Sequence, residues 1–264
     1  MTMWSLIVLL FLGSAYSRRL PKLDVQCDKN ECVVVGDLME LPDEMIREGD
    51  IIADLDLELS RNAFIDKKRR WPQGIVPYVF HNKYSLAERN RIEEAMKGIE
   101  AKTCVKFEPM AKVQGAEQTG YVMILPNEGC KSNLGYWATR GQSILSLNPL
   151  ACLPKLGVIQ HELLHVLGLK HEHARPDRDL YVDIVKENIQ QSHMQNFWKA
   201  DEVEFTTYDI PYNYESVMHY KSDAFSKNGK PTIVAKNGEG TAKMGQRKRA
   251  HDLDLQKINK MYCS

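Results

Sequence analysis

The sequence predicts an α+β fold of two parts, a twisted, mostly parallel sheet backed by two helices and a second half of irregular structure. Four short segments have the composition and turn boundaries of strands: 74–80, 105–107, 121–125 and 143–147. Two stretches, 85–99 and 156–166, carry apolar residues at helical spacing. Beyond residue 172 such patterns thin out, which indicates a less regular subdomain.

The first helix has a defined start. Ser85 and Glu88 have the spacing of a capping box, in which each side chain satisfies the other residue's backbone N–H. In the second half, helical patterns occur at 186–197 and 252–262, and two Asn-Gly pairs between them suggest a short hairpin.

The amino terminus and the composition bear on location. Residues 1–17 have the pattern of a signal peptide, an apolar run followed by small residues. The run is shorter than the roughly 20 residues that a membrane anchor needs. Lysine plus arginine equals aspartate plus glutamate, 35 each, so charge points to no nucleic acid or membrane partner. We expect a secreted, extracellular monomer.

The most informative residues follow the start of the second helix. His161 and His165 are four apart, so both imidazoles lie on one helix face and can reach one zinc ion. Glu162 can take a proton from a water at that metal without being a ligand. Gly168 lets the backbone leave the helix, so His171 can return as a third ligand. Three protein ligands and an open position predict a catalytic zinc site.

The pattern H-E-x-x-H-x-x-G-x-x-H, followed by a methionine turn at Met218, is the metzincin signature. With Glu172 after the third histidine and Tyr220 after the methionine, the chain resembles the astacin-type zinc endopeptidases. The run 171–179 is similar to that family's H-E-x-x-R-x-D-R-D, and the likeness extends over 62–263.

The resemblance implies a metzincin zinc-protease fold with one Zn²⁺ per chain. An upper subdomain, about 62–171, and a lower one, about 172–264, would flank a cleft for protein or peptide substrates. Tyr220 would be a further ligand that swings away to stabilise the tetrahedral intermediate, unless it is a buried structural tyrosine. Met218 would be a packing floor beneath the ligands.

Two charged residues have roles implied by the resemblance, each with a simpler alternative. Glu172 would bind the ammonium of the mature amino terminus, or else form a salt bridge with Arg175 or Arg178. Arg247 would favour acidic substrate residues just after the scissile bond, or else be a solvent-exposed charge.

Six cysteines suit an oxidising compartment, and the sequence alone allows 15 pairings. The resemblance implies the disulfides Cys104–Cys263 and Cys130–Cys152. The pairing of Cys27 and Cys32 stays open.

Residues 18–61 show little periodicity and could be a flexible leader. The resemblance makes them an activation pro-segment in which an aspartate occupies the metal's open position. Asp50 is the favoured residue, although Arg47 replaces the usual phenylalanine of the motif; Asp37 is the rival.

A trypsin-like protease would cut after Arg61 and make Asn62 the first mature residue, with a cut after Arg70 as the alternative.

Two other functions are possible for such a chain. One is a secreted, inactive binding protein that keeps the zinc fold, and the other is a zinc hydrolase of non-peptide substrates. An inactive protein would be expected to lack Glu162 or a histidine, and none is missing.

Overall fold

The structure is a computed structural model. It describes residues 23–28, 31–38, 45–53, 67–113, 120–136, 141–200, 205–236 and 238–263. The predicted signal peptide and the predicted Arg61–Asn62 cleavage site lie outside these ranges.

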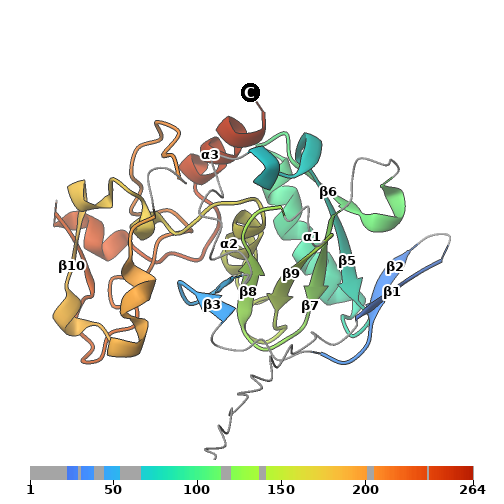
Figure 1. The fold of residues 1–264 in the computed structure, drawn as a ribbon, viewed down its shortest axis with the longest axis horizontal. Coiled ribbons are helices and arrows are strands. Elements are labelled where there is room, and N and C mark those ends of the chain that lie inside the picture. The colour runs from blue at the N-terminus through green and yellow to red at the C-terminus, as the bar shows by residue number, and fades with distance from the viewer. Residues whose placement is uncertain are drawn as a thin grey trace, which may run out of the picture.

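A nine-stranded sheet dominates the predicted upper subdomain, which lies on the right in Figure 1. Its strands are β1 (Asp24–Cys27), β2 (Cys32–Val35), β3 (Ile46–Arg47), β4 (Ile51–Ile52), β5 (Ile75–His81), β6 (Lys106–Pro109), β7 (Tyr121–Leu125), β8 (Cys130–Asn133) and β9 (Gln142–Leu147). The order is β1-β2-β5-β7-β9-β8-β4-β3, and β6 also pairs with β5. The strand pairs β2–β5, β5–β6, β5–β7, β7–β9 and β4–β8 are parallel, which confirms the predicted mostly parallel sheet.

The leader adds strands at both ends of this sheet, which the sequence did not predict. On one side β2 pairs with β5, where Val33 lies opposite Phe80. On the other side β4 pairs with β8, where Ile51 lies opposite Ser132. These strands of two to four residues are too short to show the alternation by which a strand is recognised.

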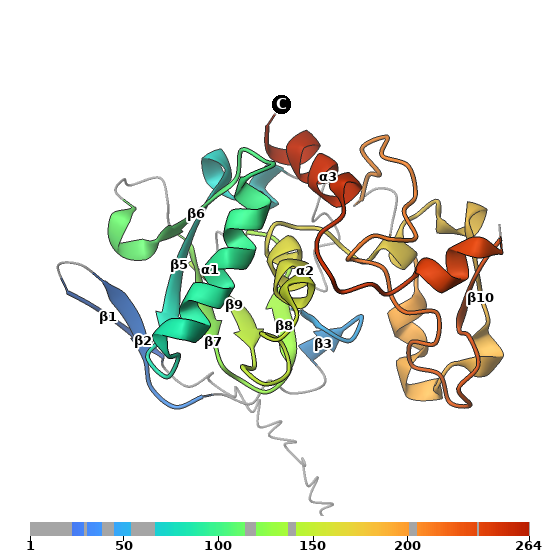
Figure 2. The same cartoon turned by 180° about the vertical axis from the view of Figure 1, so that it is seen from behind.

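Two helices cover one face of the sheet, as Figure 2 shows: α1 (Leu86–Glu100) and α2 (Leu156–Val166). The predicted capping box is present, since Ser85 Oγ accepts from the backbone N–H of Glu88 and Glu88 Oε2 accepts from that of Ser85. Both helices pack into one large apolar core with the sheet. Trp71 is buried there and donates from Nε1 to the main-chain oxygen of Val166 at the end of α2, at 2.8 Å.

A second apolar cluster includes leader residues. Val34 and Ile52 are fully buried against Val79, Met123 and Leu125 of the central strands. The predicted leader therefore contributes to the apolar core as well as to the sheet.

The lower part has little regular structure. It contains β10 (Val182–Ile184) and β11 (Ile233–Ala235), which pair antiparallel. The helix predicted for 186–197 is wrong: two 3₁₀ turns form there, Lys186–Asn188 and Gln191–Phe197.

The neighbouring chain explains this error. Between the two turns Ile189 forms an antiparallel bridge with Ser226, and Gln190 donates its backbone N–H to Phe225. Backbone N–H and C=O groups that would pair with each other inside a helix thus form hydrogen bonds with a distant segment of the chain. The hairpin expected from the two Asn-Gly pairs does not form in the described residues, because β11 pairs with the distant β10 instead.

The last helix, α3 (Asp252–Tyr262), follows the lower part in sequence but packs on the upper core. Leu255, Ile258 and Met261 belong to the same apolar cluster as Trp71. The disulfide Cys104–Cys263 lies just beyond α3 and spans 159 residues of sequence. Both implied disulfides are present, and Cys27 pairs with Cys32. Every helix in the described part of the chain is too short or too polar to cross a membrane.

Candidate metal centre

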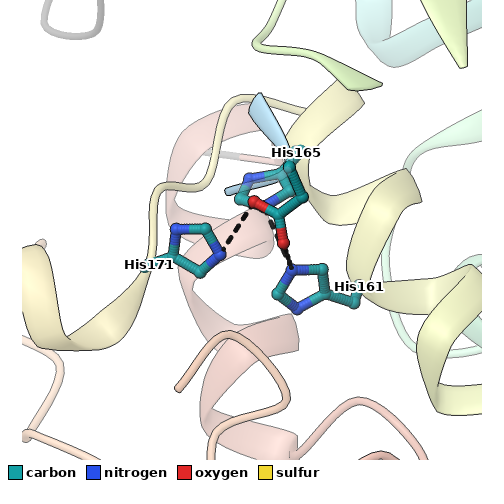
Figure 3. Close-up of side chains that lie close together, drawn as sticks. His161, His165 and His171 are labelled. Atoms are coloured by element: carbon teal, nitrogen blue, oxygen red, sulfur yellow. Dashed lines mark hydrogen bonds and ion pairs between the residues drawn. The ribbon is translucent and has the colours of Figure 1, made fainter. Parts of the chain in front are cut away.

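Three histidines converge beside the carboxyl end of α2 (Figure 3). His161 and His165 lie one turn apart on that helix. The chain then turns at Gly168, whose φ of 101° suits glycine, and returns with His171 facing them. All three side chains are buried.

The fourth member of the group is Asp50 of the leader. Its Oδ2 lies 3.1 Å from Nε2 of His161. Its Oδ1 lies 3.6 Å from Nε2 of His165 and 3.2 Å from Nε2 of His171. Asp37, the rival aspartate, is exposed beyond β2 and is not part of this group.

Hydrogen bonds fix the tautomer of two of the rings. Nδ1 of His161 and Nδ1 of His165 lie 2.8 and 2.6 Å from the main-chain oxygens of Val217 and Leu169. Because a carbonyl oxygen only accepts, each Nδ1 carries the proton and donates it. Burial lowers the pKa of His161 to about 3 and also lowers the pKa of His165, so both rings are neutral at pH 7. Their Nε2 lone pairs therefore point into the group.

The arrangement fits a zinc ion. Two lone pairs, on Nε2 of His161 and His165, face each other at 3.1 Å, which is unfavourable unless a cation lies between them. Asp50 Oδ1 and His171 Nε2 are buried and make no hydrogen bond within the described chain. Donors at about 2.0–2.1 Å from a tetrahedral zinc lie about 3.3 Å apart, close to the spacings here. Nitrogen and carboxylate donors in this number are a usual zinc set.

The imidazole of His171 differs from the other two, because its pKa is raised instead of lowered. Burial would lower the pKa of His171, but the negative charge of Asp50, 3.2 Å away, and the hydrogen bond to Glu48 raise it to about 9. A cation held at Nε2 would take the place of that proton.

Glu162 lies on α2 between the two histidines, and its Oε2 is buried with no hydrogen-bond partner in the described residues. Burial raises the pKa of this carboxyl well above its usual range, and the charge of Asp50 raises it further. A buried carboxyl oxygen without a partner is available to take up a proton and give it back, which is what a general base that later acts as an acid requires.

Asp50 reaches the centre through the turn between β3 and β4. Gly49 has a φ of 80°, and a Cβ at this position would lie 2.8 Å from the ring of Phe225. The strand β8 fixes the end of the turn, since Ser132 donates its N–H to the main-chain oxygen of Asp50. A residue with a side chain in place of Gly49 would therefore move the carboxylate.

Sequence reasoning missed Glu48. Its Oε2 lies 2.8 Å from Nδ1 of His171 and its Oε1 lies 3.0 Å from Nζ of Lys170. Its main-chain oxygen accepts from the hydroxyl of Tyr220. No local pattern could have revealed contacts that span 123 and 172 residues of sequence.

Tyr220 lies beside the third histidine. The roles predicted for Tyr220 and Met218 at the metal stay predictions. The ring of Tyr220 is 4.6 Å from that of His171 and stacks on His173 at 3.8 Å. Met218 is buried, and its main-chain oxygen accepts from the N–H of Glu172.

A family model described as Astacin, a family of peptidases, matches residues 63–263. The chain belongs to the astacin family. This match, with the metal centre and the sheet, confirms the predicted metzincin fold and its zinc cofactor.

Similar astacins are known from nematodes and fish. The zinc metalloproteinase nas-14 of Caenorhabditis elegans is 36% identical over 90% of this chain, and the low choriolytic enzyme of Oryzias latipes is 39% identical over 83%. The matched regions are 48% and 78% of those proteins, so the chain spans about half the length of several curated relatives. Among solved structures, high choriolytic enzyme 1, a hatching enzyme zinc-protease of the same fish, aligns with a TM-score of 0.65 and 36% identity. It covers 75% of this chain and 96% of its own.

In this astacin Arg247 is only partly exposed. Its Nη1 donates to the main-chain oxygens of His219, at 3.1 Å, and Gln246, at 2.9 Å. The alternative of a solvent-exposed charge therefore applies to only part of this side chain. Its predicted preference for acidic substrate residues stays a prediction.

Glu172 is fully buried in this astacin and has several partners. Its Oε1 accepts from Arg175 and from the backbone of Asn213, and its Oε2 lies 2.5 Å from Nζ of Lys257 on α3. The alternative salt bridge with Arg175 is thus present, whereas Arg178 pairs with Asp179. Lys257 was missed. It lies on the same face of α3 as Ile258 and Met261, and a lysine on an apolar helix face is a signal for a buried acidic partner.

Lys257→Met should destabilise the protein by roughly 3–5 kcal/mol, because it leaves Glu172 buried without its closest cation. The pKa of Glu172 is lowered, since the charges of Lys257 and Arg175 outweigh burial. This stabilisation is complete above the ordinary value of 4.5 and is lost as the pH falls through the lowered pKa. The difference from the wild type should therefore shrink below pH 4.5 in denaturant titrations.

The matched control is Lys102→Met, which removes an exposed ion pair with Asp252. Its unfolding midpoint should stay close to that of the wild type. Equal effects of the two substitutions on the unfolding midpoint would show that the buried pair contributes no more to stability than the exposed pair.

Proposed function

We propose that this chain is a secreted zinc-dependent endopeptidase, made as a latent precursor. One observation carries the proposal: three buried imidazoles converge with Glu162 alongside and a leader carboxylate in their midst. The names of its relatives, zinc metalloproteinases and choriolytic enzymes, support it. The alternatives of an inactive protein or a non-peptide hydrolase have no observation in their favour.

The chemistry that zinc supplies when bound is activation of a water molecule and polarisation of the scissile carbonyl. Glu162 would take a proton from that water and pass it to the leaving amine, since its buried Oε2 has no hydrogen-bond partner in the described residues. The hydroxyl of Tyr220 is released when the main-chain oxygen of Glu48 leaves, and it then donates to the oxygen that becomes negative. The edge of β8, which β4 covers in the precursor, offers backbone groups to an extended peptide.

Latency follows from the position of the leader. Asp50 occupies the place among the histidines that a reacting water needs, and Glu48 holds Tyr220. Substrate is excluded because β3 and β4 lie along the same edge of the sheet that it would use.

The contacts of Arg70 favour activation after Arg61. The guanidinium of Arg70 donates to the main-chain oxygen of Met261 at 2.7 Å and to the hydroxyl of Tyr208 at 3.3 Å. A protease would have to break both contacts to use Arg70 as its cleavage site. After a cut at Arg61, the ammonium of Asn62 would join Glu172, and a pocket lined by Glu172, Lys257 and Tyr208 gives it room.

Three disulfides support secretion, since such bonds persist in oxidising compartments. The predicted signal peptide agrees with this. The activating protease would be trypsin-like, and the enzyme would act as a monomer on protein or peptide substrates.

Glu162→Gln should keep one zinc per chain but lose at least about 100-fold in kcat, because the proton acceptor is gone while the histidines remain. Casein digestion with and without a chelator, together with metal analysis of the trypsin-activated protein, measures both properties. The control Glu94→Gln changes an exposed residue of α1 and should digest casein like the wild type. Loss of zinc in Glu162→Gln would instead mean that this residue holds the site together.

Asp50→Ala should give the uncleaved precursor measurable peptidase activity or self-cleavage, because the leader no longer fills the metal's open position. Asp37→Ala is the matched control and should leave the precursor silent. Amino-terminal sequencing of the active form completes the test, with Asn62 expected as the first residue. An Asp50→Ala precursor as silent as the wild type, or an active form beginning at Trp71, would contradict this scheme.

A further inference from the structure

The Nδ1 atoms of the three histidines differ in which part of the chain supplies their partner. Those of His161 and His165 donate to main-chain oxygens of the predicted catalytic domain, which remain after activation. That of His171 lies 2.8 Å from Oε2 of Glu48, which belongs to the leader. Activation would therefore remove the partner of Nδ1 from His171 alone among the three.

Activation would also remove the carboxylate that pairs with Lys170. Oε1 of Glu48 lies 3.0 Å from Nζ of Lys170, and this ammonium also lies 4.7 Å from the ring centroid of Phe205. Within the described residues, Glu48 is the carboxylate that pairs with Lys170. The side chain of Glu48 is only 10% exposed. Nζ of Lys170 and Nδ1 of His171 therefore bind a carboxylate that is almost fully removed from water.

This carboxylate is close to the reacting centre. Glu48 is two residues from Asp50, and two extended residues span at most about 7 Å. A substrate side chain at the same place would therefore belong to a residue near the scissile bond.

We propose that Nζ of Lys170 and Nδ1–H of His171 form a carboxylate-binding site in the activated enzyme, filled by a glutamate or aspartate side chain of the substrate. The inference rests on the proposed peptidase function. A metal at Nε2 keeps the proton of His171 on Nδ1, so this donor persists after Glu48 has left. Metal-bound histidines normally donate this second N–H to an oxygen, and a charge-assisted hydrogen bond to a carboxylate is a strong way to do so.

Lys170 is thus the specificity-determining residue of this site. Arg247, the other cation near the centre, donates to two main-chain oxygens that stay in place when the leader is removed. In the precursor the carboxylate of Glu48 pairs with Lys170. This pairing favours Lys170 over Arg247 as the residue that binds a carboxylate.

The test uses the activated enzyme and peptides with blocked ends, so that the varied side chain is the only carboxylate. Each pair of peptides differs by Glu or Gln at one of three positions on either side of the scissile bond. The measured quantity is the ratio of kcat/KM for the Glu peptide to that for the Gln peptide. We expect a ratio of about ten at one position in the wild type. It should fall to near one in Lys170→Met and be largely kept in Lys170→Arg.

Two further variants serve as controls. Lys236→Met removes an exposed lysine that pairs with Asp183, and the ratio should not change. A wild-type ratio near one at all six positions would overturn the proposal, as would a ratio that survives Lys170→Met. A preference lost in Arg247→Met but kept in Lys170→Met would assign it to Arg247 instead. Wild-type enzyme with no chelator-sensitive cleavage of any peptide would overturn the peptidase function itself.

Discussion

Three buried imidazoles share one small volume, and the structure around them serves to keep their Nε2 atoms facing one another. Carbonyl acceptors hold the Nδ1 protons of His161 and His165, which leaves two lone pairs 3.1 Å apart. Without a cation this geometry costs free energy, because no donor in the described part of the chain satisfies those lone pairs. The residues that fix it come from distant segments, the end of α2, the methionine turn and the leader.

In the proposed precursor, the leader completes this centre. It adds an aspartate to the three histidines, a second carboxylate to His171 and a backbone acceptor to Tyr220. It also extends the sheet at both ends and buries Val34 and Ile52. Its release on the proposed activation would therefore change the donors at the metal, the covered edge of β8 and part of the core together.

The metal centre could be predicted from the sequence because its ligands are close along the chain. The spacing of His161, Glu162 and His165 needs only a helix, and Gly168 supplies the turn toward His171. Glu48 and Lys257 could not be placed in the same way, since their partners lie 123 and 85 residues away. The helix prediction for 186–197 failed for a related reason, because pairing with 225–227 replaces the local hydrogen bonds of a helix.

The central claim is that one zinc joins the three histidines to the leader in the precursor. Anomalous X-ray diffraction at the zinc absorption edge, from crystals of the zinc-loaded precursor, tests it directly. The account predicts one strong peak at about 2.0–2.2 Å from Nε2 of His161, His165 and His171 and from an Asp50 oxygen. A peak elsewhere, or a zinc at the histidines with the Asp50 carboxylate beyond bonding distance, would contradict it.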